Sequence, residues 1–564
     1  MDRRDFAHLA ALAAGVSLSS SGPVDWASGS ERPAPDGAVP TIADLRAVAP
    51  PDIGVQVVLG YHQPYDGGGG LFVWETEDNP RGVYGTSGRA DDALWVVSAT
   101  NEGGFWRRVI MGEAMNVRWF GARGDGGSDD ATAINNAIWM AGYLDMARVF
   151  IPEGTYAISA PIRLSWASGL TVQGASKTRT RLRKTGDATT SVGHNADQRR
   201  VDACLVLDTI EAEDSVHGTD HYATTIKDLQ LEGTQGRRPE YGLFIKSANR
   251  LRIRNIYFQR CETAFRAERL WMSQLQNLSG KSLRRFMHVG GDIETPGRSS
   301  TSLTIQNCYV ASDLEETAFL LTDLYYASLD QCGADNVGAW PYHIVRSKGV
   351  SLRGCGFEQS LFGKGIWMHG SRGHVESCKG INVRPCRDED EPSAVLRVSD
   401  WEGRPSRVVV TSSHFGTLVD ESNTTLAPDA VDMSVNRTLL LTGDSHLTVM
   451  DTYFPPNAHD HPGWDEDSAN RLVRIGGSGG VGGLHVQTHG RLGDETTGTT
   501  LDGTSVRING RAVATLDGSN VDRLDQQVSD TYTPGEVQAI SDRLDALISA
   551  LNGSPGEDDE QDNE

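Results

Sequence analysis

Short aliphatic segments recur along the middle of the chain. Nine of them share one pattern: an aliphatic residue, two spacers, then a small or apolar residue. The last positions of these segments are Leu229, Ile256, Leu278, Cys308, Cys332, Cys355, Cys378, Ser413 and Thr452. They lie 22 to 39 residues apart. The shorter intervals suit one turn of a parallel β-solenoid, and the longer ones suit turns that carry loops.

The cysteines follow this repeat. In a solenoid, equivalent residues of successive turns stack about 4.8 Å apart, and the inward ones are apolar. Four of the seven cysteines fall in one file: Cys308, Cys332, Cys355 and Cys378. We expect them to be mainly reduced, because small, soft side chains pack well inside a stack. The other cysteines are Cys204, Cys261 and Cys386, and a Cys378–Cys386 disulfide is the alternative. No Cys/His spacing indicates a zinc site.

A helix is predicted ahead of the repeats. Residues 116–138 read NVRWFGARGDGGSDDATAINNAI, a glycine-rich loop followed by apolar positions at helical spacing, with Asp129 or Asp130 as the cap. Residues 149–151 and 155–159 then form strands around a PEG turn. A phosphate-binding loop is disfavoured, because the loop has no lysine and Asp125 would repel an anion.

The segments FGARGDGGSDDATAINNAI and VFIPEGTYAI resemble the opening motif of the pectate lyase superfamily. The resemblance implies an all-β fold: a right-handed, single-stranded parallel β-helix (a pectin lyase-like solenoid) with an N-terminal capping helix, as in tailspike-like proteins. It covers about 45 residues and does not fix the reaction, because the family includes lyases, hydrolases, epimerases and binding proteins. Residues 41–110 resemble a small module that precedes this motif in tailspike-like proteins.

Five regions follow from these patterns. We expect a twin-arginine-like signal and linker at 1–39, a small β-rich module at 40–112, the β-helix at 113–455, a β-rich extension at 456–530, and a helix with an acidic tail at 531–564. The start MDRRDFAHLAALAAGV predicts export, with an ordinary amphipathic tail as the alternative. No apolar stretch is long enough for a membrane span in the mature chain. The apolar face of the C-terminal helix either packs on the solenoid or forms a homotrimer.

The net charge of −23 argues against nucleic acid as a partner, since phosphate binding requires clustered Lys and Arg. The repeat instead predicts a pair of outward carboxylates. Asp335 and Glu358 stand three residues after their cysteines on successive turns, where Ala311 and Ile381 stand on the flanking turns. Neighbouring carboxyl groups of this kind can divide into an acid and a base or nucleophile for glycosidic cleavage. The plain alternative is chance, because acidic residues are abundant in this chain.

Other residues of the same turns complete the predicted site. Asp330 and Asp323 are further candidate acids. The candidates for substrate binding are Trp340, Tyr342, His343, Arg353 and Trp367. Elimination would require a base and, on the substrate carboxylate, either a cation such as Ca²⁺ or an arginine such as Arg353 or Arg346. Calcium is a candidate cofactor only for a lyase, and otherwise no cofactor or metal is predicted.

Two functions therefore remain open. The first is a secreted polysaccharide-degrading enzyme, a hydrolase or a lyase. The polygalacturonase-type Asn-Thr-Asp and Gly-His-Gly motifs are not recognisable, which argues against simple pectin hydrolysis. The second is a non-catalytic carbohydrate-binding or surface-attachment protein, and epimerisation of a sugar polymer is a third reading.

Overall fold

A computed structural model describes residues 37–49, 54–76, 88–100, 103–164, 168–193, 198–208, 221–294, 299–360, 364–383 and 393–415, and short segments after them: 436–442, 445–450, 452, 473–476, 483–487, 505–508 and 511–515. The predicted export signal, Cys386 and the C-terminal helix lie outside the described residues, as does most of the predicted extension. No described helix is long and apolar enough to cross a membrane.

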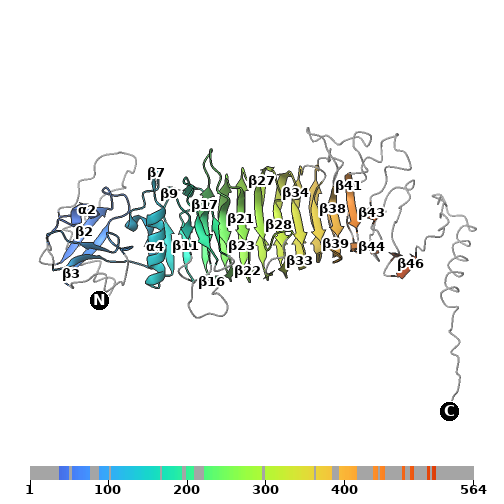
Figure 1. Cartoon of the computed structure of the whole chain (residues 1–564), viewed down its shortest axis with the longest axis horizontal. Coiled ribbons are helices and arrows are strands. Elements are labelled where there is room, and N and C mark those ends of the chain that lie inside the picture. The colour runs from blue at the N-terminus through green and yellow to red at the C-terminus, as the bar shows by residue number, and fades with distance from the viewer. Residues whose placement is uncertain are drawn as a thin grey trace, which may run out of the picture.

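The chain begins with a small β-sheet module (Figure 1). Its strands, in spatial order, are β1 (Val39–Thr41), β2 (Val55–Gly60), β3 (Gly70–Glu75), β5 (Phe105–Arg108) and β4 (Trp95–Val97), with the short helix α2 (Ile42–Leu45) beside them. Phe72 and Trp106 are fully buried in its core. The loop between β2 and β3 is fastened by Asp66, whose carboxylate accepts backbone N–H bonds from Tyr61, His62 and Gly68. These bonds lower the pKa of Asp66 although its partial burial acts in the opposite direction.

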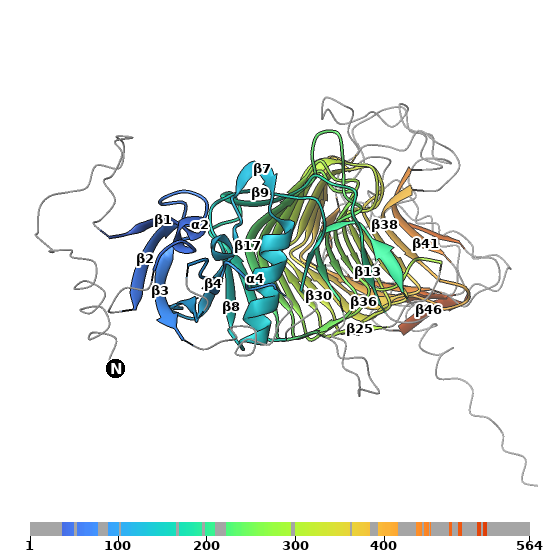
Figure 2. The same cartoon turned by 60° about the vertical axis from the view of Figure 1, so that its left-hand side comes forward.

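The helix α4 (Ala131–Tyr143) covers the N-terminal end of the β-helix (Figure 2). Its buried face includes Ile134, Ala137 and Ile138, as the spacing predicts. Asp130 occupies the cap position, but its carboxylate accepts the backbone N–H groups of residues 123 and 124 and so ties down the preceding loop. Asp129 accepts the N–H of Ala131 instead.

The predicted glycine loop is in part a strand. Residues Asp125–Asp129 form β7, which pairs with β9 (Gly154–Ile158) of the first turn. The other elements of this end are β6 (Ala114–Asn116), the 3-10 helix η1 (Val117–Phe120) and β8 (Arg148–Ile151). Gly124 has a φ of +63°, and a side chain there would meet the ring of Tyr156 at 2.9 Å. The glycines thus allow a close approach of the backbone to the first turn.

The rest of the chain is a tube of stacked turns with three faces. Face A is one parallel sheet of eleven strands. They are β10 (Ile162–Arg163), β15 (Ala203–Leu207), β18 (Tyr241–Ile245), β21 (Thr263–Ala267), β24 (Arg285–Val289), β28 (Phe319–Thr322), β32 (Tyr342–Val345), β35 (Ile366–His369), β38 (Ser393–Ser399), β41 (Asn436–Thr442) and β43 (Val473–Gly476).

Faces B and C belong to a second, larger sheet that bends along its length. In the early turns one strand crosses the bend: β17 (Thr225–Glu232), β20 (Arg252–Gln259) and β23 (Gln274–Lys281). In the other turns a face B strand precedes the bend and a face C strand follows it. These pairs are β11 (Thr171–Gly174) and β12 (Thr180–Lys184), β26 (Thr304–Gln306) and β27 (Tyr309–Leu314), β30 (Ser328–Asp330) and β31 (Gly333–Val337), β33 (Lys348–Arg353) and β34 (Gly356–Glu358), β36 (Arg372–Glu376) and β37 (Lys379–Ile381), and β39 (Arg407–Thr411) and β40 (His414–Phe415).

Short strands line the corner between faces A and B: β16 (His221–Tyr222), β19 (Ala248–Asn249), β22 (Leu270–Trp271), β25 (Ser300–Thr301) and β29 (Leu324–Tyr325). The remaining described strands are the hairpin β13 (Thr190–Val192) and β14 (Arg199–Val201), then β42 (His446–Met450), β44 (Gly483–Gln487), β45 (Ser505–Ile508) and β46 (Arg511–Thr515). Strand pairing along faces A, B and C is parallel, and the chain forms the predicted right-handed parallel β-helix.

The bend between faces B and C has a fixed backbone conformation. One residue per turn has positive φ: Asp228, Asn255, Asn277, Asn307, Gln331, Gly354, Ser377 and Ser412. Asn and Gly adopt this left-handed conformation at the lowest cost, which explains the polar spacers of the sequence repeat. The side-chain amides also form hydrogen bonds between successive turns, since Asn255 donates to Asp228 at 2.6 Å and Asn277 donates to Asn255 at 3.1 Å.

The residue after each bend points into the core, and here the cysteine file is confirmed. Cys308, Cys332, Cys355 and Cys378 are buried and free. The thiols of Cys355 and Cys378 donate to the equivalent carbonyl oxygens of the turn below, those of Leu329 and Leu352, at 3.3 and 3.4 Å. Cys378 has no disulfide, so the alternative pairing with Cys386 is not formed.

Candidate functional site

The two predicted acids lie side by side on face C. Asp335 on β31 is the register partner of Glu358 on β34, with Ala311 before them and Ile381 after them. Neighbouring parallel strands are about 4.8 Å apart, so their carboxyl groups project from adjacent positions of one surface. Both side chains are half-buried. The adjacency predicted from the repeat is confirmed.

Each acid has a neighbour that orients it. The hydroxyl of Tyr309 donates to Oδ2 of Asp335 at 2.6 Å, and Nδ2 of Asn382 donates to Oε1 of Glu358 at 2.9 Å. Tyr309 belongs to the turn before the acids and Asn382 to the turn after them. Four successive residues of one surface therefore form a short polar row along the tube axis.

Burial raises the pKa of Asp335, and the negative charge of Glu358 raises it further. The hydrogen bond from Tyr309 acts in the opposite direction but does not cancel these effects. The same bond, with Asp335 as acceptor, raises the pKa of Tyr309 to about 12, so this phenol remains a donor at neutral pH. Asp335 thus retains a proton to higher pH than an aspartate in water does.

Asp330 lies across the bend, on face B. Its Oδ1 accepts from Nε of Arg353 at 2.9 Å, and its Oδ2 accepts from Ser328 at 3.0 Å. Arg353 is the register partner of Asp330 on the next turn, and Glu376 follows on the turn after that. Asp330 and Arg353 therefore form an ion pair of their own, separate from the pair on face C.

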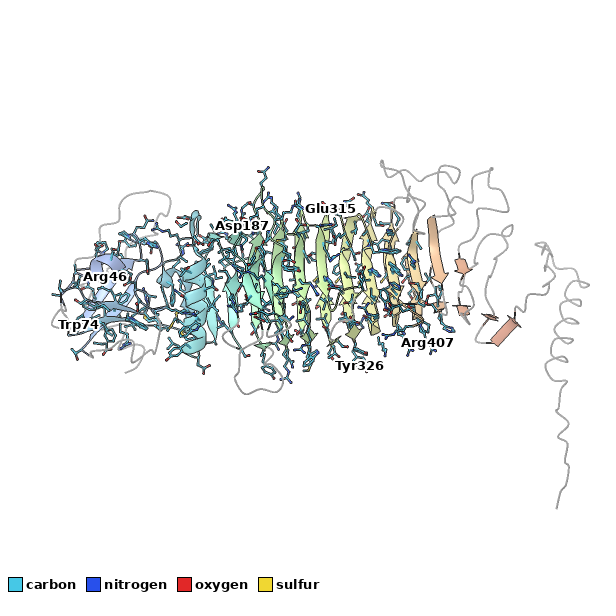
Figure 3. The ribbon with its side chains drawn as sticks, in the orientation of Figure 1. Arg46, Trp74, Asp187, Glu315, Tyr326 and Arg407 are labelled. Carbon is cyan, nitrogen blue, oxygen red and sulfur yellow. The ribbon has the colours of Figure 1, made fainter. Side chains whose placement is uncertain are left out.

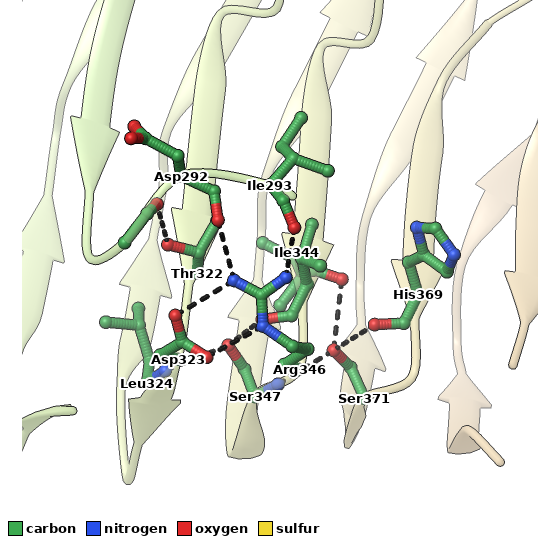
Figure 4. Close-up of polar contacts among 12 residues, drawn as sticks. Asp292, Ile293, Thr322, Asp323, Leu324, Ile344, Arg346, Ser347, His369 and Ser371 are labelled. Atoms are coloured by element: carbon green, nitrogen blue, oxygen red, sulfur yellow. Dashed lines mark hydrogen bonds and ion pairs between the residues drawn. The ribbon is translucent and has the colours of Figure 1, made fainter. Parts of the chain in front are cut away.

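Asp323 is a correction to the predicted site. It is buried, and its carboxylate forms two bonds with the buried Arg346, at 2.8 and 3.0 Å (Figure 4). The same guanidinium donates to the carbonyl oxygens of Asp292 and Ile293, which lie over face A. Both side chains are buried and hold this loop in place, so neither is accessible to a substrate. No local sequence pattern indicates this pair, because both partners lie at short bends between strands.

Tyr342 is a second correction. It points into the core, is fully buried, and donates to the carbonyl oxygens of Cys332 and Gly356 at 2.8 and 2.9 Å. Its ring stacks on Phe319 of the previous turn with centroids 5.1 Å apart. Alternation along β32 explains the error: Tyr342 faces inward, and the next residue, His343, faces outward.

The other predicted aromatic residues cluster on the outer side of face A. His343 stacks on Trp367 at 4.1 Å, and Trp340 lies 5.0 Å from Trp367. Trp340 and His343 are nearly fully buried, whereas Trp367 is half-buried. The guanidinium of Arg397 lies 4.2 Å from the Trp367 ring centroid. Burial, and then the nearby His369, lower the pKa of His343 well below its usual value, so this ring is neutral.

Of Trp340, His343 and Trp367, Trp367 is thus the most open ring, and it lies around a corner from the acids. The cluster also contains His369 and Trp401, whose rings are 4.7 Å apart. Sequence analysis missed these two, and it missed Tyr309 and Asn382. The repeat itself contains the signal, because Tyr309 stands one residue after its cysteine and Asn382 four residues after its own.

Among the described residues, no group of three or more His, Cys, Asp or Glu side chains is arranged to hold a metal ion.

Comparison with known proteins agrees with this architecture. Residues 114–206 match the family described as rhamnogalacturonase A/epimerase, pectate lyase-like. Residues 38–111 match the phage tail protein small four-stranded beta-sheet domain. A comparison with curated proteins finds no match.

Two solved structures share the fold. The tailspike of Acinetobacter phage vb_AbaP_AS12 has a TM-score of 0.61 and 18% identity, over 88% of this chain and 78% of that one. The tailspike of Acinetobacter baumannii phage AM24 has a TM-score of 0.50 and 12% identity, over 80% of this chain and 65% of that one.

The fold defines the class, a right-handed parallel β-helix with a pectate lyase-like segment at residues 114–206, and the two tailspikes share this fold. A phage-tail β-sheet module precedes the β-helix in this chain.

Proposed function

We propose that this protein degrades an extracellular polysaccharide and that Asp335 and Glu358 are its catalytic residues. The observation that supports this most is the register pairing of two half-buried carboxyl groups, one of which has a raised pKa. A surface that pairs a proton-holding acid with a second carboxylate is the arrangement that glycosidic cleavage requires.

In the proposed reaction Asp335 donates its proton to the glycosidic oxygen as the bond to the anomeric carbon breaks. Glu358 supplies the carboxylate that attacks that carbon. A water molecule then releases the sugar, and Asp335 takes the proton of that water. Strands about 4.8 Å apart place the carboxyl groups near the roughly 5 Å separation of retaining glycosidases, so retention of the anomeric configuration is expected.

Tyr309 and Asn382 are positioning residues in this proposal. The bond from Tyr309 fixes Oδ2 of Asp335 and so orients the carboxyl group that carries the transferred proton. The bond from Asn382 fixes Oε1 of Glu358. Neither group is expected to exchange protons during the reaction.

One observation favours the second candidate, a carbohydrate-binding or attachment protein without turnover. Both carboxylates already accept a hydrogen bond from a neighbouring turn. A row of bonded polar side chains along a β-helix also serves stability alone. In that case the half-buried Trp367 would contribute a stacking surface and no bond would be cleaved.

The location follows from the substrate. A sugar polymer of this kind is extracellular, and we propose that the protein acts there; export by the twin-arginine route and a homotrimeric state are part of this proposal.

The test is incubation of the purified chain with a panel of acidic and neutral bacterial polysaccharides. New reducing ends without a new double bond support hydrolysis. Absorbance of an unsaturated product supports elimination, with a base other than the one assigned here. If the protein binds polymers of the panel but forms no product from any of them, the enzymatic proposal is contradicted and the second candidate is supported.

A further inference from the structure

One edge of the tube carries a long row of rings and cations. It follows the corner between faces A and B, where successive strands pair in register. In order, the row consists of Tyr222, Asn249, Trp271, Thr301, Tyr325, Lys348, Arg372, Arg407 and His446. Eight steps of about 4.8 Å make it roughly 40 Å long. Figure 3 shows Tyr326 and Arg407 along this lower edge.

Of the rings in this row, Tyr222 is exposed and Trp271 and Tyr325 are half-buried, and each is accompanied by a cation. Tyr222 is 43% exposed, and Tyr326, which follows Tyr325 and lies beside the row, is 73% exposed. The cation–ring pairs are Arg250 with Tyr222, Arg269 with Trp271 and Lys348 with Tyr325, at 5.0, 5.0 and 5.5 Å from the ring centroids. Rings that remain open to solvent along one edge of a tube form a surface that a ligand can cover.

Face B beside this row is also basic. On face B, two files of outward-facing residues lie nearest to the row. They contain Lys227, Arg252, Arg254 and Arg353. Within the described turns, Asp330 and Glu376 are the only carboxylates of these two files, and both are register neighbours of Arg353. Within the part of the chain that the structure describes, Arg252, Arg254, Arg372 and Arg407 are exposed and make no ion pair.

This edge is positively charged, whereas the molecule as a whole is negatively charged. The whole chain carries −23, and the opposite edge includes the exposed Asp187 and Glu315 (Figure 3). Unpaired arginines gathered on one side of an acidic protein create a local positive potential that attracts an anionic ligand.

We infer that this basic edge, formed by Tyr222, Trp271, Tyr325 and Tyr326 with Arg250, Arg252, Arg254, Lys348, Arg372 and Arg407, binds an extended carboxylate-bearing polysaccharide that lies along the tube axis. The spacing of the turns is close to the advance of one sugar residue in an extended chain, so that equivalent positions meet successive sugars. Sugar rings stack on the aromatic side chains, and guanidinium groups bind carboxylates.

The files of face B supply the remaining contacts. Gln274, Gln276, Thr304 and Gln306 are outward and at least partly exposed. Amides and hydroxyls of this kind suit a ligand that is dense in hydroxyl groups. Nucleic acid is the less suitable polyanion, because its far denser charge would meet the negative field of the rest of the chain. The inference does not depend on whether Asp335 and Glu358 are catalytic.

The test measures binding of the full chain to three probes at low salt: polygalacturonate, its methyl ester, and single-stranded DNA with the same number of charges. The ester keeps the backbone and removes the charge. We expect polygalacturonate to bind at least tenfold more tightly than the ester and than the DNA. We expect its affinity to fall as salt rises, since screening weakens charge contacts.

Two variants locate the site. Replacement of Arg252, Arg254, Arg372 and Arg407 by Gln is expected to weaken polygalacturonate binding about tenfold or more and to leave binding of the ester unchanged. The matched control replaces four exposed arginines elsewhere, Arg123, Arg179, Arg238 and Arg284, and is expected to change affinity less than twofold. Replacement of Tyr325 and Tyr326 by Ala is expected to weaken both polymers, because stacking does not require charge.

Three outcomes overturn the inference: equal affinity for the acid and its ester, unchanged affinity in the four-arginine variant, or preference for DNA. Cleavage measured in the same variants separates this test from that of the proposed function. A variant that binds poorly but cleaves a short soluble oligosaccharide normally supports the inference.

Discussion

Asp335 and Glu358 stand opposite each other on adjacent turns, and a hydroxyl from a third turn, that of Tyr309, bonds to Asp335 at 2.6 Å. The three residues span 50 positions of sequence but lie within three turns of the tube. This contact exists only because the turns stay in register. The site is therefore a direct product of the repeat.

Replacement of Asp335 by Asn is expected to stabilise the fold slightly at pH 7. The folded-state pKa of Asp335 is raised, so stability is lost as pH rises through that pKa, and the neutral amide does not incur this loss. The gain is at most about 1 kcal/mol, because the side chain is half exposed to solvent. Urea unfolding at pH 7 and at pH 3.5 measures it, and the difference should vanish at the lower pH.

The matched control is Asp330→Asn on the other side of the bend. Asp330 is held by Arg353 at 2.9 Å. Loss of this partly exposed ion pair is expected to destabilise the fold by about 0–1 kcal/mol at pH 7. Equal destabilisation by both substitutions would show that Asp335 has no special environment.

The cysteine file predicts a pattern of chemical protection. Cys204, Cys261, Cys308, Cys332, Cys355 and Cys378 are buried and free. We expect them to resist alkylation in the native state and to react fully in denaturant. Mass spectrometry of peptides after labelling with iodoacetamide distinguishes each site. Rapid native labelling of Cys332 or Cys355 would mean that the file does not lie inside the tube.

At the bend, we expect the introduction of a glycine in one turn to stabilise the fold and the removal of a glycine in the next turn to destabilise it. Gln331 and Gly354 occupy the same bend position, with φ of 55° and 59°. Gln331→Gly is expected to stabilise by roughly 0.5–1 kcal/mol, because glycine adopts positive φ without strain. Gly354→Val is expected to destabilise by at least about 1 kcal/mol. Thermal unfolding of both variants checks the signs, and like effects from the two would contradict the assigned conformation.

Buried histidines on face A predict sensitivity to acid. Burial, and then Arg266, lower the pKa of His288 to about 3. Between about pH 6.5 and 3 the unfolded chain therefore binds one more proton at this residue than the folded chain, and stability falls as pH falls. The contribution is about 1.4 kcal/mol per pH unit. His288→Gln should reduce the slope of unfolding free energy between pH 6 and 4 by about this amount; an unchanged slope would mean that His288 titrates normally.

Much of the fold follows from the sequence because a solenoid contains one local rule many times. An aliphatic residue, a polar spacer suited to positive φ, and a small core residue appear in each turn, and stacking converts this spacing into files. The adjacency of Asp335 and Glu358 follows from counting along the same file. The capping helix follows from its apolar positions, such as Ile134 and Ile138.

For residues outside the repeated positions, the repeat does not indicate whether the side chain faces the core or the solvent. Tyr342 and His343 are adjacent in sequence and face opposite ways, and only the phase of β32 decides which of them points into the core. Asp323 meets Arg346 because both lie at corner positions under a loop from residue 292, and no local pattern indicates that loop. The exposed rings of the basic edge are visible only when the turns are stacked.

Product formation by four matched proteins tests the central claim most directly. The wild type, Asp335→Asn, Glu358→Gln and the control Asp330→Asn are incubated with a polysaccharide that the wild type degrades, and reducing ends are measured. We expect both substitutions on face C to lower the rate by at least about a hundredfold, as for loss of a general acid or nucleophile, while Asp330→Asn stays within threefold. Wild-type rates in Asp335→Asn and Glu358→Gln would contradict the assignment of this pair as the catalytic site.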